Sequence, residues 1–474
     1  MSHHIPDPNK NVTLTIDGQS VTVPEGTKIL EAARKANSFI PTLCDHPDLC
    51  RRAVCRICVV ECDGKGKLLA ACANDVWEGV SVVTNNSRIA SIRKTIIELL
   101  LANHPQECLT CAANTNCKLQ ALAKMYGIRE TVFRREAVNR QAISEDNALL
   151  RDMDKCVKCG RCVEACQTIQ TVRAINSSHR SVNYRISTAF NQSYEDSPCV
   201  FCGHCETVCP VGAIYEQDQS AEAWAAINDK ERKTAVQFSR TLCPELDTVS
   251  GFPAGTAGAG KTVTALKRLG FDKIYDAQIT ADIAASELNI ELQHRVNNSG
   301  SPLPLISACS QSAVKFIENF YPDLAPLLSP CRSPREVFAS TVKDEKTTVI
   351  SIEPCVCNKI KSKQPSANEF IPPCPDITLT VKELARMIKL AGIDFASLPE
   401  SPFDTIKTEI VLKEQALEIK TKCLIAKGLG EARTILDSIR KGECDAAFVG
   451  IRSCPLADGR PRCTSIGSGA IQIN

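Results

Sequence analysis

The sequence has little excess charge and no long apolar run. Its 474 residues include 56 Lys and Arg and 54 Asp and Glu, which leaves a formal net charge of +2. A nearly neutral chain gives no reason to expect nucleic acid or an anionic membrane surface as a partner. The longest apolar stretch, around residues 96–102, is far shorter than the ~20 residues that span a bilayer. We therefore expect no membrane span and no nucleic-acid partner.

The sequence also lacks a charged and then apolar leader, yet it contains 27 cysteines. Without such a leader, and with an odd number of cysteines in a long chain, a secreted disulfide scaffold is not expected. The composition instead predicts a cytoplasmic protein in which reduced thiolates hold metal. Seventeen of the cysteines lie between Cys44 and Cys209, so a metal-dense front half precedes a larger, metal-poor back half, with the boundary near residue 216.

The front half opens with a hairpin signal. Asp17-Gly18 separates two alternating runs, 12–16 and 21–23, and this pattern predicts a β-hairpin. Thr27 is expected to cap a helix that runs to about Ala36. A hairpin followed by a helix that packs across it is how a small β-grasp domain begins.

The first cysteine group reads C-x10-C-x2-C-x13-C and follows this predicted domain start. A tight C-x2-C pair with one distant cysteine on each side suits the four thiolates of a [2Fe–2S] cluster. A zinc ribbon is the alternative, although ribbons usually bring two C-x2-C pairs. Cys50 and Cys62 fall off the spacing and are interpreted as bystanders. The predicted ligands are Cys44, Cys55, Cys58 and Cys72.

The second group follows a predicted amphipathic helix over 89–102 and reads H-x3-C-x2-C-x5-C. One imidazole and three thiolates complete the four ligands of a [4Fe–4S] cluster, and the neutral imidazole should change its potential. A structural zinc ion accepts the same ligands and is the alternative. The predicted ligands are His104, Cys108, Cys111 and Cys117.

The third group is the most specific, because the run C-x2-C-x2-C-x3-C occurs twice. This is the bacterial two-cluster ferredoxin pattern, in which the fourth cysteine of each run binds the other cluster. The first predicted [4Fe–4S] site uses Cys156, Cys159, Cys162 and Cys209, and the second uses Cys199, Cys202, Cys205 and Cys166.

Residues 255–262 match the G-x4-G-K-[ST] phosphate-loop pattern. Such a loop follows a buried strand, but residues 244–253 are not hydrophobic enough for one. Pro244 and Pro253 would also interrupt its hydrogen bonds. We therefore interpret the match as a Gly-rich loop that precedes a helix over 263–269, not as a nucleotide site.

Short apolar runs alternate with helical periodicity from about residue 235, which predicts an α/β architecture. Three of these runs, 303–306, 348–352 and 446–451, end close to a cysteine. Sites in open α/β sheets form beyond the carboxyl ends of the strands. We therefore expect three cysteines to converge on one pocket: Cys309, Cys355 and Cys454.

With these motifs, the chain resembles the iron-only ([FeFe]) hydrogenases over nearly its whole length. The three cluster groups occur in the order of that family's accessory modules, and residues 266–273 and 313–322 are similar to its catalytic domain. In that family the Gly-Lys loop at this place has no nucleotide function. The resemblance implies a multidomain α+β and α/β fold. Its parts are a β-grasp [2Fe–2S] domain (1–82), a helical histidine-ligated [4Fe–4S] segment (83–145), a bacterial 2[4Fe–4S] ferredoxin domain (146–216) and an iron-only-hydrogenase-like α/β domain (217–474).

The resemblance fails at the family's active site, the six-iron H-cluster, which four cysteines from three motifs hold. The first motif, normally Thr-Ser-Cys-Cys-Pro, keeps its proton-relay cysteine as Cys309 but has Ser310 at the ligand position. The second, normally Met-Pro-Cys-x-x-Lys, keeps Cys355 but has Asn358 in place of the lysine.

The third motif, normally Glu-x-Met-x-Cys-x3-Cys-x2-Gly-Gly-Gly, keeps Cys454 but has Asp458 where the bridging cysteine belongs. A carboxylate is a poor substitute for a thiolate on an iron–sulfur centre. We therefore expect no H-cluster and no hydrogen turnover by this chain alone. The remaining thiols either hold a residual [4Fe–4S] cluster or pack as small hydrophobic side chains. They are Cys309, Cys355, Cys357 and Cys454.

One [2Fe–2S] and three [4Fe–4S] sites beside an incomplete catalytic centre predict an electron-transfer scaffold subunit without catalytic residues. The resemblance implies a soluble, NAD(H)- and ferredoxin-linked oxidoreductase complex that bifurcates electrons. Its partners would be an FMN-containing NAD(H)-binding subunit, a small [2Fe–2S] subunit, ferredoxin and, in some assemblies, a nickel–iron hydrogenase or formate dehydrogenase module. The alternatives are an active iron-only hydrogenase with a variant H-cluster, a relative of the complex I large subunit, and a redox sensor.

Overall fold

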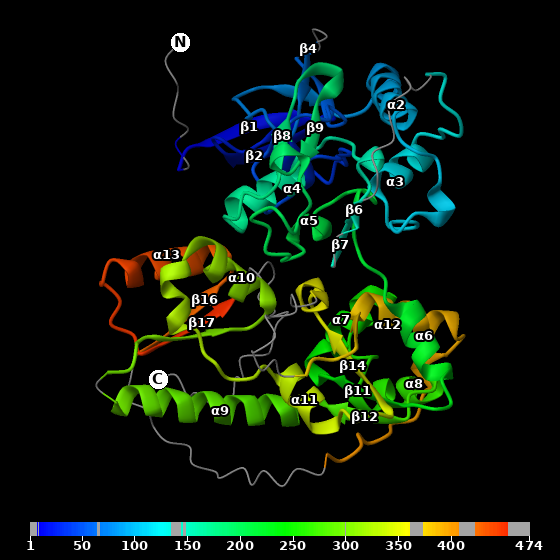
Figure 1. The fold of residues 1–474 in the computed structure, drawn as a ribbon. Coiled ribbons are helices and arrows are strands. Elements are labelled where there is room, and N and C mark those ends of the chain that lie inside the picture. Colours follow the sequence, from blue (N-terminus) through cyan, green and yellow to red (C-terminus); the bar gives the residue numbers. More distant parts are fainter. Residues whose placement is uncertain are drawn as a thin grey trace.

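The computed structural model describes residues 7, 9–63, 67–133, 144–145, 148–298, 300–360, 373–406 and 422–453. These residues form two bodies (Figure 1). The front half, through strand β10 (Ile214–Glu216), forms the upper body of the view, and the back half forms the lower one. No helix among these residues is long and apolar enough to cross a membrane.

A five-stranded sheet begins the front half, in the order β2-β1-β5-β3-β4. The predicted hairpin is confirmed: β1 and β2 are antiparallel, and Asp17 and Gly18 both have positive φ, as a two-residue hairpin turn requires. The predicted helix cap is wrong. Lys28 is the N-cap of helix α1, whereas the Thr27 hydroxyl donates to the carbonyl of Pro24 at 2.6 Å. The elements are β1 (Asn11–Ile16), β2 (Gln19–Pro24), α1 (Ile29–Lys35), β3 (Val59–Cys62), β4 (Lys67–Ala70) and β5 (Ser81–Val83).

Two helices follow this sheet, α2 (Ser87–Ala102) and α3 (Lys118–Met125). The predicted helix over 89–102 is confirmed and begins two residues earlier, because the Asn86 side chain accepts from the amide of Ile89 at 2.8 Å. The short helix η1 (Cys108–Thr110) lies between them. An apolar core of α2 and α3 residues, including Ile97 and Leu119, packs beside the cysteines of this region.

The two ferredoxin-like runs are joined by antiparallel pairing of β7 (Leu149–Arg151) with β10. Each run begins a short helix directly after a left-handed glycine: Gly160 (φ 77°) precedes α4 (Arg161–Glu164), and Gly203 (φ 75°) precedes α5 (His204–Thr207). The other elements are β6 (Ser144–Glu145), the π-helix η3 (Ala165–Ile169), β8 (Asn176–Ser178) and β9 (Arg185–Ser187).

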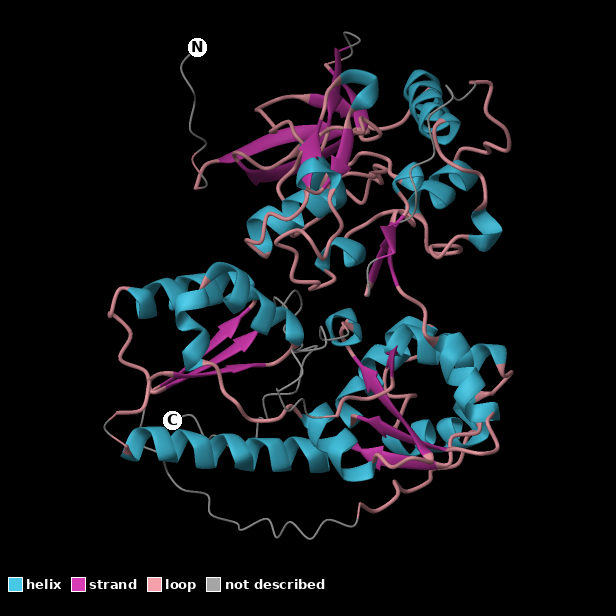
Figure 2. Cartoon of the chain, viewed as in Figure 1, coloured by secondary structure: helices cyan, strands magenta, loops and turns pink. Residues whose placement is uncertain are grey.

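The back half contains two parallel sheets instead of one, ordered β12-β11-β14-β15 and β13-β17-β16. Helices pack beside both sheets, and the long α9 contacts α11 (Figure 2). The strands are β11 (Lys233–Phe238), β12 (Lys273–Asp276), β13 (Leu305–Ala308), β14 (Thr347–Glu353), β15 (Ile377–Thr380), β16 (Cys423–Lys427) and β17 (Phe448–Arg452). The helices are α6 (Ser220–Asn228), α7 (Cys243–Ser250), α8 (Ala259–Leu269), α9 (Ala277–Asn297), α10 (Gln311–Phe320), α11 (Pro334–Val342), η8 (Val356–Lys359), α12 (Val381–Leu390) and α13 (Leu429–Arg440).

Candidate metal centres

The four thiols predicted for the [2Fe–2S] site lie together. Cys58 Sγ is 3.3 Å from Cys72 Sγ. Hydrogen bonds from Cys55 and Cys72 lower the pKa of Cys44, while the Cys44 sulfur raises the pKa of Cys55. Cys62 is fully buried and its pKa rises to about 11 through burial and the nearby Asp63, without a contribution from the four. The connected set is therefore the one that the spacing selects.

Three thiols of the helical segment are also neighbours. Burial raises the pKa of Cys117, and the sulfurs of Cys111 and Cys108 add to the rise. His104 is half-buried just after α2, where its backbone amide donates to Leu101. The structure thus brings the three cysteines together, and His104 as their fourth ligand stays a prediction.

The first ferredoxin-type site contains the predicted exchange of cysteines. A small cavity of about 20 Å³ is lined by Cys156, Cys159, Cys162 and Cys209, so the fourth cysteine of the second run joins the first run. Burial raises the pKa of Cys162 well above its ordinary value, and the other three thiolates add to the rise. A buried apolar cavity lined by four thiols fits a cluster that thiolates ligate.

The second site repeats this arrangement. Burial raises the pKa of Cys205, and the sulfurs of Cys202, Cys199, Cys162 and Cys166 contribute in turn. Cys166 and Cys162 both lie near Cys205, and Cys166 as the fourth ligand of the second site stays a prediction.

The two ferredoxin-type loops share a backbone hydrogen bond to a cysteine sulfur. Lys158 N donates to Cys156 Sγ at 3.4 Å, and Phe201 N donates to Cys199 Sγ at 3.4 Å. Lys158 and Phe201 both have positive φ, which turns these amides toward the sulfurs. An amide that donates to a thiolate stabilises the charged form that binds iron. The local backbone is therefore shaped for thiolates in both runs.

Among the described residues, no three His, Cys, Asp or Glu side chains converge as ligands of one metal ion do. An iron–sulfur cluster makes a different demand, because each thiolate binds its own iron and the sulfurs stand apart around the core.

The candidate sites are neighbours in the fold. The sulfur of Cys44 contributes to the pKa of Cys159, so the [2Fe–2S] thiols lie near the first ferredoxin-type site. A Cβ placed on Gly212 would meet Cys111 Sγ at 2.6 Å, which puts the helical site against the chain that follows Cys209.

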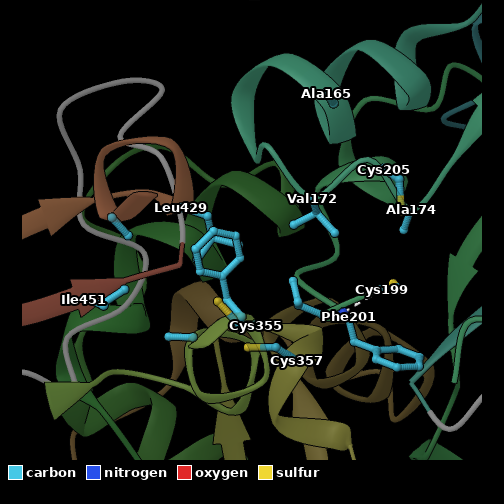
Figure 3. Packing of buried hydrophobic residues seen from close by; sticks show 14 of the residues in the cluster. Ala165, Val172, Ala174, Cys199, Phe201, Cys205, Cys355, Cys357, Leu429 and Ile451 are labelled. Atoms are coloured by element: carbon cyan, nitrogen blue, oxygen red, sulfur yellow. Dashed lines mark hydrogen bonds between the residues drawn. The ribbon is translucent and has the colours of Figure 1, made fainter. Parts of the chain in front are cut away.

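The second ferredoxin-type site packs against the back half. A Cβ on Gly203 would overlap Val356, which stands between Cys355 and Cys357. These two cysteines share one apolar core with Cys199, Phe201 and Cys205 (Figure 3).

The back half has a cavity of about 280 Å³ beyond the ends of β13 and β14. Cys309 and Asn358 line it, and Cys355 and Cys357 are buried in the core that also includes Cys309. Cys454 and Asp458 lie outside the described residues. Of the other two cysteines expected to converge on one pocket, Cys309 lines this cavity and Cys355 does not. Strands β13 and β14 belong to different sheets.

The side chains of this cavity largely bind one another. Ser310 Oγ is 2.9 Å from Ser453 Oγ, and Asn358 Nδ2 donates to a carboxylate oxygen of Glu353 at 3.0 Å. Arg335 Nη1 donates to the backbone carbonyl of Asn358 at 2.5 Å. A hydroxyl and a neutral amide therefore occupy positions where the resemblance implies a thiolate and a lysine.

The Gly-rich loop 255–262 uses its own amides internally. The carboxylate of Asp247, which is 4% exposed, accepts from the amides of Gly255 and Ala257 at 2.7 Å each. Lys261 Nζ donates to the carbonyl of Ala396 at 2.8 Å. The segment before the loop is helix α7, with Pro244 in its first turn, and not a strand. The amides of Gly255 and Ala257 and the ammonium of Lys261 are therefore already occupied within the protein.

Sequence reasoning missed a group of buried arginines. Arg161 is 3% exposed and stands between Cys159 and Cys162, and Arg93 is 2% exposed and donates to the carbonyl of Val59, next to Cys58. A charged residue inside a C-x2-C-x2-C run was the available signal for Arg161. For Arg93, nothing in the local pattern distinguishes it from an exposed helix arginine.

Comparisons with known proteins agree with this order of sites. A model described as iron only hydrogenase large subunit, C-terminal domain, matches residues 232–416. The NADP-reducing hydrogenase subunit HndD of Solidesulfovibrio fructosivorans is 35% identical over 413 residues, which are 83% of this chain and 71% of that protein. The chain belongs to the iron-only hydrogenase family. Iron hydrogenase 1 of Clostridium pasteurianum, also of this family, is 31% identical over 83% of this chain and 70% of its own length.

The front half of this family member matches three further models. They are a 2Fe-2S iron-sulfur cluster binding domain (9–87), an NADH-ubiquinone oxidoreductase-G iron-sulfur binding region (93–131) and a 4Fe-4S dicluster domain (155–213). The predicted fold class is confirmed, and the chain has 2Fe-2S and 4Fe-4S binding domains. A solved NAD+-reducing [NiFe]-hydrogenase aligns with a TM-score of 0.41 and 30% identity, over 44% of this chain and 87% of that one.

Proposed function

We propose that this chain is the iron–sulfur electron-transfer scaffold subunit of a cytoplasmic, NAD(H)- and ferredoxin-linked hydrogenase-type oxidoreductase. It holds one [2Fe–2S] and three [4Fe–4S] clusters and assembles no H-cluster. The observation that carries the proposal is that the cysteine groups are neighbours. Arg161 of the first ferredoxin-type run donates to the carbonyl of Asp45, the residue after Cys44. Cys111 Sγ lies at Gly212, and Gly203 of the second run lies against Val356.

The clusters, when bound, supply one-electron transfer. The chain's own residues keep the four sites close to one another and bury part of the two ferredoxin-type sites. Cys159 and Cys205 are at most 7% exposed, and apolar side chains such as Phe201 fill the space beside them. Burial of this kind favours electron transfer through the clusters over chemical reaction of the thiols with solvent.

Catalysis is assigned to partner subunits because the cavity of the back half has Ser310 and Asn358 where a ligand and an anchoring lysine are needed. The names of relatives support an NAD(P)-linked complex. One relative is the NADP-reducing hydrogenase subunit, and the NADPH-Fe(3+) oxidoreductase subunit alpha of Geobacter sulfurreducens is 35% identical over 205 residues, which are 43% of this chain and 24% of that protein. We infer an FMN-containing NAD(H)-binding subunit, a small [2Fe–2S] subunit and ferredoxin as partners, with a nickel–iron hydrogenase or formate dehydrogenase module as the catalytic unit and electron bifurcation as the overall activity.

Iron and spectra of the anaerobically purified chain test this proposal. About 14 iron atoms per chain are expected, from one two-iron and three four-iron sites, with electron paramagnetic resonance signals of both cluster types. Infrared bands of bound CO and cyanide, or hydrogen evolution after maturation, would instead support an active hydrogenase with a variant H-cluster. About 18 iron atoms without such bands would indicate the residual [4Fe–4S] cluster at Cys309, Cys355, Cys357 and Cys454.

The electron-transfer role between partner subunits can be tested separately in the assembled complex. Cys156→Ser together with Cys199→Ser should interrupt electron transfer between the NAD(H) and hydrogenase or formate partners, while Cys50→Ser, at an exposed thiol, should leave it unchanged. Unchanged turnover in the double variant contradicts the role.

A further inference from the structure

Arg161 is a buried cation that forms no ion pair with a side chain of the described residues. Its side chain donates to the carbonyl of Asp45 and, at 3.5 Å, to the carbonyl of Val208. In the described part of the chain, no carboxylate lies within ion-pair distance of its guanidinium; Asp45 pairs through its side chain with Arg34 and Arg51 instead. An arginine stays protonated at any physiological pH, so the charge is permanent.

A buried charge of this kind is expensive. Removing an ion from water costs several kcal/mol unless a counter-charge and hydrogen bonds compensate it. Two carbonyl oxygens supply hydrogen bonds but no net negative charge. The position of Arg161 indicates where the counter-charge lies. It stands between two cysteines of the first ferredoxin-type site, its carbonyl partners are one residue from Cys44 and Cys209, and its charge acts to lower the pKa of Cys159.

We propose that Arg161 is the shared counter-charge of the [2Fe–2S] site and the first ferredoxin-type [4Fe–4S] site, and that its guanidinium raises the reduction potential of both. The inference rests on the proposed function, because it requires that thiolate-ligated clusters occupy these sites. Reduction adds negative charge, so a nearby cation stabilises the reduced state more than the oxidised state. Arg161 is 3% exposed, and the interaction is therefore only weakly screened.

The same loop provides a matched control. Lys158 lies two residues after Cys156, in the same C-x2-C-x2-C run, but its side chain is exposed. An exposed charge is screened by water and salt, and its removal should change the potential little. Arg161→Gln and Lys158→Gln thus remove one positive charge each from the same loop, one from a buried position and one from an exposed position.

The test is a redox titration of the whole purified chain, followed by electron paramagnetic resonance. For Arg161→Gln, the equilibrium constant for one-electron reduction should fall at least tenfold at both sites, which is a shift of about 59 mV toward negative potential. Arg161→Lys should restore most of the shift, and Lys158→Gln should leave both midpoints near those of the wild type. Equal midpoints in Arg161→Gln and the wild type, or equal shifts in Arg161→Gln and Lys158→Gln, overturn the proposal.

Iron content separates this inference from the proposed function. If the wild type itself lacks both clusters, the proposed function fails and not only the role of Arg161. Arg161→Gln could lose the first [4Fe–4S] cluster while the wild type keeps it. In that case the midpoint potential of the [2Fe–2S] cluster is compared between Arg161→Gln and Cys156→Ser. Cys156→Ser is expected to lack the same [4Fe–4S] cluster but retains the arginine. A more negative midpoint in Arg161→Gln then supports the proposal, and an equal one overturns it.

Discussion

The ion pair of Lys359 with Glu383 lies in the back half and binds the segment that joins it to the front half. Both side chains are 0% exposed, and Lys359 Nζ is 2.7 Å from Glu383 Oε2. The same ammonium donates to the carbonyl of Gln217 at 2.5 Å, and Glu383 Oε1 accepts from the amide of Gln219 at 2.6 Å. Residues of η8 and α12 are thereby tied to the segment that leaves the ferredoxin-like domain.

Lys359→Met removes one partner of this pair and leaves a buried carboxylate. Such a change typically costs about 3–5 kcal/mol, so the hydrogen-exchange protection of α12 amides should fall on the order of 10²- to 10³-fold. The double variant Lys359→Met with Glu383→Gln removes both charges and should recover a large part of the loss. The measurement is hydrogen exchange by mass spectrometry on the anaerobic holoprotein.

Lys382 supplies the control for this prediction. It pairs with Glu206 at 2.8 Å, but its side chain is 45% exposed, and exposed pairs contribute about 0–1 kcal/mol. Lys382→Met should therefore reduce protection less than tenfold. If Lys359→Met behaves like Lys382→Met, or if the double variant is no better protected than the single one, the reasoning about the buried pair is wrong.

Three further predictions concern single sites. Asp247→Ala should lower the free energy of unfolding by about 1–3 kcal/mol, because two loop amides lose their acceptor. Millimolar ATP should not raise the melting temperature of the wild type. A nucleotide-induced rise would contradict the interpretation of the Gly-rich loop. Cys58→Ala should remove about two iron atoms per chain, whereas Cys62→Ala should retain them. Iron analysis that shows the reverse would make Cys62 the ligand and Cys58 the bystander. Burial raises the pKa of Glu216 above its unfolded value, so its contribution to stability is present at low pH and is lost as pH rises through the folded pKa. Glu216→Gln should flatten the pH dependence of β10 protection, and an unchanged profile would show that another group titrates.

Local patterns in the sequence predict much of the front half. The Asp17-Gly18 hairpin and the helix before His104 depend on contacts close in sequence, and the C-x2-C-x2-C-x3-C repeat fixes which thiols gather. The helix cap at Lys28 was missed because Thr27 has a competing acceptor, the carbonyl of Pro24.

The back half was harder to predict because its contacts are distant in sequence. Parallel strands do not reveal their order, so the separation of β13 and β14 into two sheets is not visible in the apolar runs. Pro244 argued correctly against a strand before the Gly-rich loop, but its preference for the first turn of a helix was not used to predict α7. The carboxylate of Asp247 and the carbonyl partners of Arg161 also come from folding that no local motif specifies.

The close approach of Gly203 and Val356 has a consequence for the tolerance of the chain to truncation. Helix η8 packs against the last ferredoxin-type loop, so removal of the back half should expose Phe201 and Cys205 to solvent.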